Sequence, residues 1–193
     1  MNAQGKRSGE TAREYAYRMI REQVISLELK PGEAFNDMEF AAKIGVSRTP
    51  VREAVIQLSE ESRIIEIFPQ RGMRIAPIDV ELVEEARSLR VLLEKQIAGM
   101  CCEMATEEDI KWLQENVGLQ EFYMENSRPE MVMQLDDEMH HKLFMICHRE
   151  LTYGMCQKLA IHYDRIRSLS VNTVKDNTII EIGRASCRER VFW

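Results

Sequence analysis

The sequence predicts a mainly α-helical chain in two parts: an N-terminal helical domain that ends in a small β-hairpin, and a C-terminal antiparallel α-helical bundle. Two patterns support this fold class. One short stretch, residues 63–76, is rich in β-branched residues and contains a turn with Pro and Gly. From Asp79 onward, glycine and proline become sparse and helix-forming residues dominate.

The chain has 193 residues, of which 45% are hydrophobic and 30% are charged, as in globular proteins. Four segments are expected: a disordered arm (1–9), a compact domain (10–78), an all-helical domain (79–180) and a non-native tail (181–193). No apolar run is long enough to span a bilayer, and the polar N-terminus is not a signal peptide. The five cysteines follow no metal or disulfide spacing, which favours reduced thiols and a cytoplasmic location.

The charges are distributed unevenly between the two halves. Residues 1–77 hold 12 Lys and Arg against 11 Asp and Glu, a net charge of +1. The remainder holds 14 against 21, a net charge of −7, which together gives −6. The acidic second half is therefore expected to be a poor nucleic-acid binder with another role.

Residues 36–58 have the pattern of two helices joined by a tight turn at Gly45. Ser47 is a good N-cap for the second helix, and Pro50 lies in its first turn, where its missing N–H costs nothing. The apolar positions that would pack the two helices together are Met38, Phe40, Ala41, Ile44, Val51, Val55 and Leu58.

The second of these helices begins with two arginines and two hydroxyl side chains: Ser47, Arg48, Thr49 and Arg52. Arg48 and Arg52 are four residues apart and so share a helix face. Such a first turn suits entry into a DNA major groove. An ordinary helical hairpin with solvated arginines is the alternative that the spacing alone leaves open.

A β-hairpin is predicted next, with arms at residues 63–68 and 73–76 and a turn at residues 69–72. A helix-turn-helix followed by such a hairpin is a winged helix. Arg71 and Gly72 lie at the tip of the wing, where a guanidinium can enter a minor groove or pair with phosphate.

Residues 29–32, 45–54 and 69–72 resemble the winged-helix domain of GntR-type bacterial transcription regulators, over about residues 11–78. One position departs from the family, which often has an arginine where this chain has Met38. The resemblance implies DNA binding through Ser47, Arg48, Thr49, Arg52, Arg71 and Gly72.

Helices are expected near residues 80–104, 107–126, 128–148 and 152–173, with Asp79 and Thr106 as N-caps of the first two. Residues 90–94, 105–108 and 136–143 resemble the all-helical FCD-type effector-binding domain of the FadR branch. The resemblance implies that Arg90 binds a carboxylate of a small organic acid effector.

Asp136 and His140 are four residues apart, a spacing that lets a carboxylate and an imidazole bind one divalent cation. A solvated helix face is the alternative. In metal-binding members of this branch, such a pair lies inside the bundle with later histidines, so the resemblance implies that Asp136 and His140 bind Zn, Ni or Mn. His141 is expected to be exposed, and His148 and His162 to be surface or capping residues.

Residues 181–191 lack a helical apolar period and resemble the translation of a sequencing-library adapter, which predicts a non-native tail. The alternative is a genuine basic tail. The natural protein is then expected to continue past Ile180, so the bundle is incomplete and lacks the later histidine ligands. Metal binding by this chain is accordingly expected to be weak.

The function expected from these patterns is transcriptional regulation, as a repressor. A homodimer would bind double-stranded DNA at an inverted-repeat operator, and the effector would change its affinity for DNA. The alternatives are a metal-dependent enzyme that uses Asp136 and His140, and a helical protein-interaction module. An enzyme would need a nucleophile, a third metal ligand and a base, none of which the sequence offers, so no enzymatic activity is expected. Because no apolar run is long enough to span a bilayer, no membrane association is expected either.

Overall fold

The computed structural model describes residues 5–173 and is mainly α-helical, as predicted. Its elements in chain order are α1 (Ala12–Ile25), β1 (Ala34–Phe35), α2 (Asp37–Ile44), α3 (Arg48–Ser62), β2 (Ile65–Phe68), β3 (Gly72–Ile75), α4 (Val80–Met104), α5 (Glu107–Glu125), α6 (Pro129–Ile146), α7 (Glu150–Leu159) and α8 (Ile161–Thr173). None of these described helices combines the length and apolar composition that a bilayer span requires.

The chain forms two compact units. The first unit contains Met1–Glu84 together with Lys158–Leu169, and the second is built around Glu85–Gln157. The first unit therefore takes a segment from late in the sequence, which includes most of α8.

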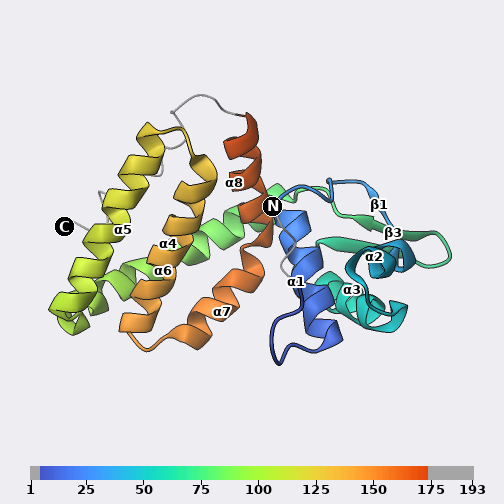
Figure 1. Cartoon of the computed structure of the whole chain (residues 1–193), viewed down its shortest axis with the longest axis horizontal. Helices are drawn as coiled ribbons and strands as arrows, with labels where there is room; N and C mark the ends of the chain where they lie inside the picture. The colour runs from blue at the N-terminus through green and yellow to red at the C-terminus, as the bar shows by residue number, and fades with distance from the viewer. Residues whose placement is uncertain (1–4, 174–193) are drawn as a thin grey trace. The chain divides into compact units, whose positions relative to one another are not determined.

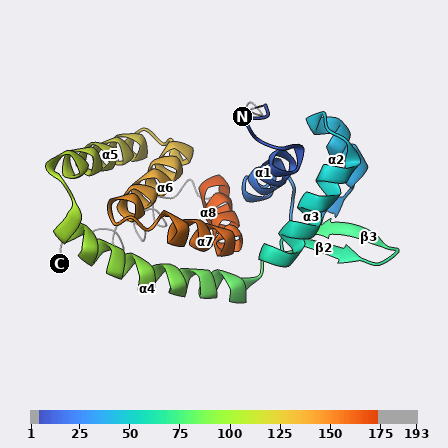
Figure 2. The same ribbon diagram turned by 90° about the horizontal axis from the view of Figure 1, so that it is seen from below.

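In the first unit, α1, α2 and α3 pack with a three-stranded antiparallel sheet of order β1-β3-β2. The predicted hairpin is β2 and β3, in which Ile65 pairs with Ile75, and Figure 2 shows it extending beyond α2 and α3. The predicted winged helix is thus confirmed, with an additional strand, β1, that the sequence did not indicate. Its core contains Tyr15, Ala16, Met19, Ile20, Val24, Phe35, Phe40, Ala41, Val51, Ala54, Val55, Leu58, Ile64, Ile65, Ile75 and Ile161.

Local sequence signals explain where these helices begin and end. Thr11 and Glu14 form a reciprocal capping box at the start of α1. Asn36 caps α2 by accepting the amides of Met38 and Glu39. Gly45 ends α2 in the left-handed conformation, at φ 73°, which glycine adopts without a steric penalty.

The buried face of α2 differs by one residue from the predicted one. Met38 is exposed, so its predicted place in the core is wrong. The buried positions are Asp37, Phe40 and Ala41, with Ile44 packed at the edge of the core. This i, i+3, i+4, i+7 series is the apolar stripe expected of a short helix, except that its first member is a carboxylate.

The helix expected at residues 152–173 is in fact two helices, α7 and α8, which separate at Ala160. Ile161, the first residue of α8, is fully buried in the core of the first unit.

Two buried polar side chains of α8 bond to backbone groups of the first unit. The Arg165 guanidinium donates to the carbonyl oxygens of Ala76 (2.7 Å) and Pro77 (3.5 Å), just after β3. The His162 ring accepts the amide of Asp79 at Nδ1 (3.1 Å), and its Nε2 lies 3.2 Å from the carbonyl oxygen of Ser62, the last residue of α3. Of the two roles expected for His162, surface or capping, the structure shows the second.

In the second unit, α5 and α6 pack against each other, and α4, α6 and α7 share a small core. Buried residues of that core are Ile97, Cys101, Phe144, Ile146 and Cys147. The predicted N-caps are present: Asp79 accepts the amides of Glu81 and Leu82, and Thr106 forms a capping box with Asp109.

The described cysteines are free thiols: Cys101, Cys147 and Cys156 are buried, and Cys102 is exposed. The Sγ atoms of Cys101 and Cys147 are 3.3 Å apart. Burial raises the pKa of Cys101 to about 12, so this thiol stays protonated at neutral pH. A protonated, buried thiol is a poor nucleophile and a poor metal ligand.

Three predicted segments fall partly or wholly outside the described residues: the N-terminal arm, the end of the helical bundle and the tail. Gly5–Gly9, the described part of the expected N-terminal arm, hydrogen-bonds to α1 through Arg18, which donates to the Gly5 carbonyl oxygen at 3.3 Å. The expected tail, residues 181–193, lies outside the described residues, as do the end of the expected bundle and Cys187.

We expect the stability of the first unit to fall in mild acid through His162. Burial, and secondarily the Arg165 charge, lower the pKa of His162 below its ordinary 6.5. The unfolded chain then binds more protons than the folded chain just below pH 6.5, so the free energy of unfolding decreases as the pH falls through that window. The stability advantage of the native protein over His162→Gln should therefore shrink between pH 7.5 and 5.5.

Urea unfolding followed by circular dichroism at several pH values measures this difference. His148→Gln, which changes an exposed histidine outside the first unit, is the matched control. Identical pH slopes for the native protein and His162→Gln would show that the ring is not buried in its neutral form.

Candidate nucleic-acid interface and polar cluster of the helical unit

The first turn of α3 presents the predicted DNA-contacting residues on the surface. Ser47, Arg48, Thr49 and Arg52 are all exposed. The exposed fractions of the Arg48 and Arg52 side chains are 55% and 61%. Arg48, Thr49, Arg52, Glu53 and Ile56 line an open hollow along this face of α3. The structure therefore brings together the four residues that the sequence singled out here.

Ser47 occupies the N-cap position, but its hydroxyl makes no capping hydrogen bond. The third helical position is Pro50, which has no N–H to donate to a cap. The Ser47 hydroxyl and the first amides of α3 thus remain at the surface. Such a helix start suits a phosphate, because its free amides and the positive end of the helix dipole both favour an anion.

Asp37 is a residue of this site that the sequence pattern did not reveal. Its carboxylate lies under the first turn of α3, where Arg48 Nε donates to Oδ1 at 3.0 Å and an Arg52 terminal nitrogen lies 3.7 Å from Oδ2. Only 4% of the Asp37 side chain is exposed. The available signal was its place in the i, i+3, i+4 series with Phe40 and Ala41, which puts it on the buried face of α2.

Arg71 and Gly72 are exposed at the β2–β3 turn, as predicted for the tip of the wing. The Arg71 amide donates to the Phe68 carbonyl oxygen at 3.0 Å, and Gly72 has φ 97°, a conformation that strains other residues. Arg74 is different, since its guanidinium pairs with Glu66 and lies over the Phe68 ring. Arg71 is therefore the arginine of this turn that extends toward solvent.

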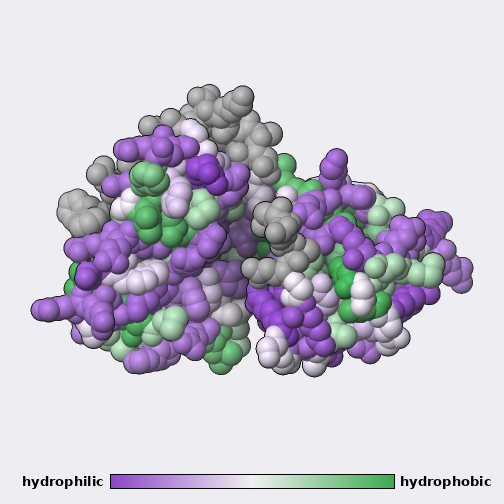
Figure 3. All heavy atoms as spheres, in the orientation of Figure 1, coloured by the Kyte–Doolittle hydropathy of each residue, from purple (hydrophilic) through white to green (hydrophobic). Residues whose placement is uncertain are grey.

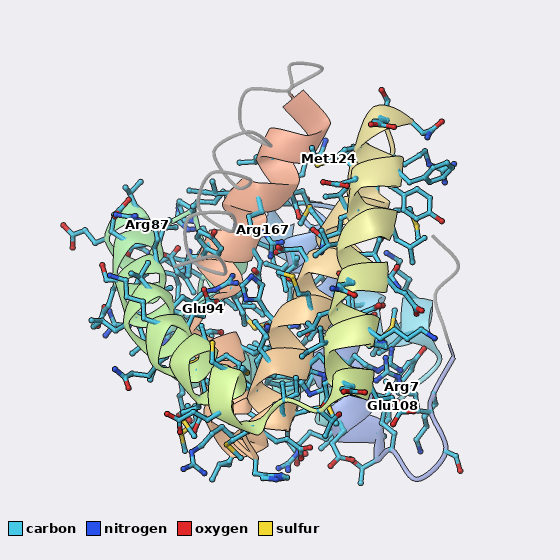
Figure 4. The ribbon with its side chains drawn as sticks, turned by 90° about the vertical axis from the view of Figure 1, so that its left-hand side faces the viewer. Arg7, Arg87, Glu94, Glu108, Met124 and Arg167 are labelled. Atoms are coloured by element: carbon cyan, nitrogen blue, oxygen red, sulfur yellow. The ribbon has the colours of Figure 1, made fainter. Side chains whose placement is uncertain are left out.

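In the second unit, a cluster of four polar side chains joins α4 to α6. Arg90 Nε lies 2.9 Å from Glu94 Oε1 within α4. On α6, His140 Nδ1 lies 3.2 Å from the same Glu94 oxygen, and His140 Nε2 lies 3.6 Å from Asp136 Oδ1. Figure 4 shows Glu94 on the side of α4 that faces the other helices of the unit. The structure thus brings the predicted Arg90, Asp136 and His140 together.

Glu94 is the member of this cluster that the sequence reasoning missed, although it stands four residues after Arg90 on the same face of α4. Each of the four side chains is less than a quarter exposed. His141 and His148 are exposed, as expected, and the His141 ring stacks on Tyr153.

The distance between the Asp136 and His140 side chains suits two ligands of one small metal ion. A tetrahedral ion with bonds of about 2.0–2.2 Å holds two of its ligand atoms roughly 3.4 Å apart, close to the 3.6 Å between Asp136 Oδ1 and His140 Nε2. Glu94 lies at the other ring nitrogen, where metal-binding histidines usually have a carboxylate or carbonyl partner. Among residues 5–173, however, no group of three or more His, Cys, Asp or Glu side chains is arranged to hold a metal ion.

Comparison with known proteins places both units in described families. Residues 12–75 match the family model of bacterial regulatory proteins of the gntR family, and residues 85–181 match the FCD domain model. The chain is 30% identical to the HTH-type transcriptional repressor RspR of Escherichia coli K12 over 158 residues, which cover 82% of this chain and 69% of the relative.

Solved structures show the same fold. The E. coli protein McbR/YncC superposes with a TM-score of 0.66 at 19% identity, over 85% of this chain and 77% of its own. A GntR-type protein from Rhodococcus sp. RHA1 gives 0.58 at 18% identity, over 93% and 87%. Neither the enzyme nor the interaction-module alternative agrees with these matches. The chain belongs to the gntR family of bacterial regulatory proteins and is a transcriptional regulator in which an FCD effector-binding domain follows the DNA-binding domain.

Proposed function

We propose that the protein is a repressor that binds an inverted-repeat operator as a homodimer, with a small carboxylate effector in the helical unit controlling its affinity for DNA. The observation that carries the proposal is the exposed pair Arg48 and Arg52 on the first turn of α3. Arginine side chains at the start of such a helix reach base edges in the major groove.

Two further features of the first unit support the same mode of binding. Ser47, Thr49 and the free amides at the start of α3 suit phosphate contacts that set the register of the protein on DNA. Arg71 and Gly72 at the wing tip suit the backbone or the minor groove. Binding by these arginines releases counterions from DNA, so it should depend strongly on salt concentration.

A homodimer matches the two-fold symmetry of an inverted repeat. The second unit has exposed apolar side chains on α5, namely Ile110, Val117, Leu119 and Phe122, and Figure 3 shows hydrophobic residues on the surface near the end of α5. Apolar surface of this kind is common at subunit interfaces. Repression is the mode named for the relative RspR, and the cytoplasm, where bacterial DNA lies, is the proposed location.

In the helical unit, Arg90 is the proposed partner of the effector carboxylate, and Asp136 and His140 are the proposed ligands of Zn, Ni or Mn. Arg90 already pairs with Glu94, so an effector carboxylate must compete with that carboxylate for the guanidinium. Two protein ligands leave most of the coordination shell of a cation to water, which makes weak binding the expectation for the described residues.

The recognition helix is tested by Arg48→Ala and Arg52→Ala in the full chain. Each should weaken binding to an operator selected from random duplexes by about 1–3 kcal/mol, because a bidentate arginine contact to a base is lost. Fluorescence anisotropy at several salt concentrations measures the affinity, and light scattering of the complex should show two protomers per operator. Lys111→Ala, which removes one positive charge from an exposed position of α5, is the charge-matched control. If both arginine variants bind the operator as the native protein does, α3 is not the recognition helix.

Arg71→Ala should have a different signature if the wing-tip arginine contacts the DNA backbone. Affinity should fall by similar factors on operator and shuffled duplexes, and the slope of log affinity against log salt should decrease by about one. The same anisotropy titrations measure both quantities. A loss confined to the operator would instead assign Arg71 to base reading.

The metal proposal is tested by calorimetry with Zn²⁺ on the full chain. Weak binding that a chelator reverses is expected, and Asp136→Ala or His140→Ala should each weaken it more than about tenfold, a loss that even outer partners of metal sites produce. His141→Ala changes the adjacent, exposed histidine and is the matched control. Zinc binding that survives in His140→Ala would place the metal elsewhere.

A further inference from the structure

We propose that Asp37 is a positioning residue for DNA recognition, with two opposite effects on binding. Its buried carboxylate holds Arg48 and Arg52 in the geometry that reads bases, and it also reduces their attraction to DNA phosphates of any sequence. The proposal rests on the proposed function, since it concerns how the same surface distinguishes an operator from other DNA.

The position of the Asp37 carboxylate links it to both arginines. Asp37 begins α2, and its side chain is almost fully buried beneath two arginines whose own side chains are more than half exposed. A buried carboxylate without cationic partners is strongly destabilising, so the arginines and Asp37 are energetically linked. Glu39, also in the first turn of α2, is exposed and accepts from the Asn36 side chain at 2.9 Å instead.

The geometry of the Arg48 contact restricts how this side chain can meet DNA. Arg48 donates through Nε to Asp37 at 3.0 Å, a charge-assisted bond that restricts the guanidinium plane. The two terminal nitrogens of Arg48 are then left to face a base edge. Restricting a long side chain before binding reduces the entropy lost in the complex, which favours the one DNA sequence that fits.

The charge of Asp37 affects binding to DNA of any sequence. One carboxylate at 3.0 Å and 3.7 Å from the two guanidinium groups offsets part of their positive charge. Binding to DNA of arbitrary sequence depends mainly on that charge, whereas discrimination depends on side-chain geometry. Removal of the Asp37 charge should therefore strengthen non-specific binding and weaken operator binding. A general loss of structure would weaken both.

The test uses Asp37→Asn in the full chain, a variant that keeps the size and one acceptor oxygen of the side chain. Anisotropy titrations compare an operator selected by the native protein from random duplexes with a shuffled duplex of equal length. We expect shuffled binding to rise about threefold and its salt slope to steepen by up to about one, while operator binding falls about tenfold. The ratio of the two affinities should thus fall by roughly 10- to 100-fold.

Two variants serve as controls. Glu39→Gln removes an equal charge from the same helix turn without touching the arginines, so it should leave the ratio of the two affinities unchanged. Asp37→Glu retains the charge and should keep shuffled binding at the native level. Thermal unfolding monitored by circular dichroism checks that each variant is folded.

An independent measurement uses the native protein and needs no substitution at Asp37. The Nε–H proton of Arg48, assigned by its loss in Arg48→Lys, should exchange slowly with water in NMR spectra because it is bonded to Asp37. Exchange as fast as that of a solvated guanidinium overturns the proposal, as does an unchanged ratio of affinities in folded Asp37→Asn. If the native protein shows no preference for any duplex, the proposed function fails first, and slow exchange at Arg48 would still support the contact itself.

Discussion

The packing of α3 against α1 is the constraint on which the DNA-binding surface depends. Val51, Val55 and Leu58 of α3 are completely buried. Since burying each such side chain stabilises a protein by about 1.5–3 kcal/mol, the three together approach the roughly 5–15 kcal/mol by which a whole domain is stable. Rotation of α3 about its axis is therefore prohibitively costly. The direction in which Arg48 and Arg52 extend is a consequence of the core on the opposite face of the same helix.

Much of this unit could be predicted from sequence because its signals are local. The spacing of Val51, Val55 and Leu58, the turn at Gly45 and the wing were all evident in short stretches of residues. The register of α2 was not, since an eight-residue helix has few apolar positions and Met38 is more hydrophobic than Asp37. That carboxylate is buried against the arginines of the next helix, and hydrophobicity patterns do not include such a partner. The two-residue strand β1 was too short to give any periodic signal.

The helical unit shows the same division between local and distant contacts. Asp136 and His140 were found through their spacing on one helix, and Arg90 through its resemblance to a known motif. The contact between Glu94 and His140 joins α4 to α6, so no spacing within one helix reports it. It also changes the expected chemistry of the cluster. Arg90, the proposed partner of the effector carboxylate, contacts the same Glu94 carboxylate as His140, the proposed metal ligand.

The discontinuous first unit has a consequence for protein synthesis. Residues up to Glu84 leave the ribosome early, but Ile161, His162 and Arg165 complete the same unit only after residues 85–157 have been made. At translation rates of about 5–20 residues per second, that interval lasts several seconds. During it, the carbonyl groups of Ser62, Ala76 and Pro77 lack their α8 partners. A nascent or prematurely terminated chain therefore carries an unfinished DNA-binding unit, and full-length synthesis supplies the segment that completes it.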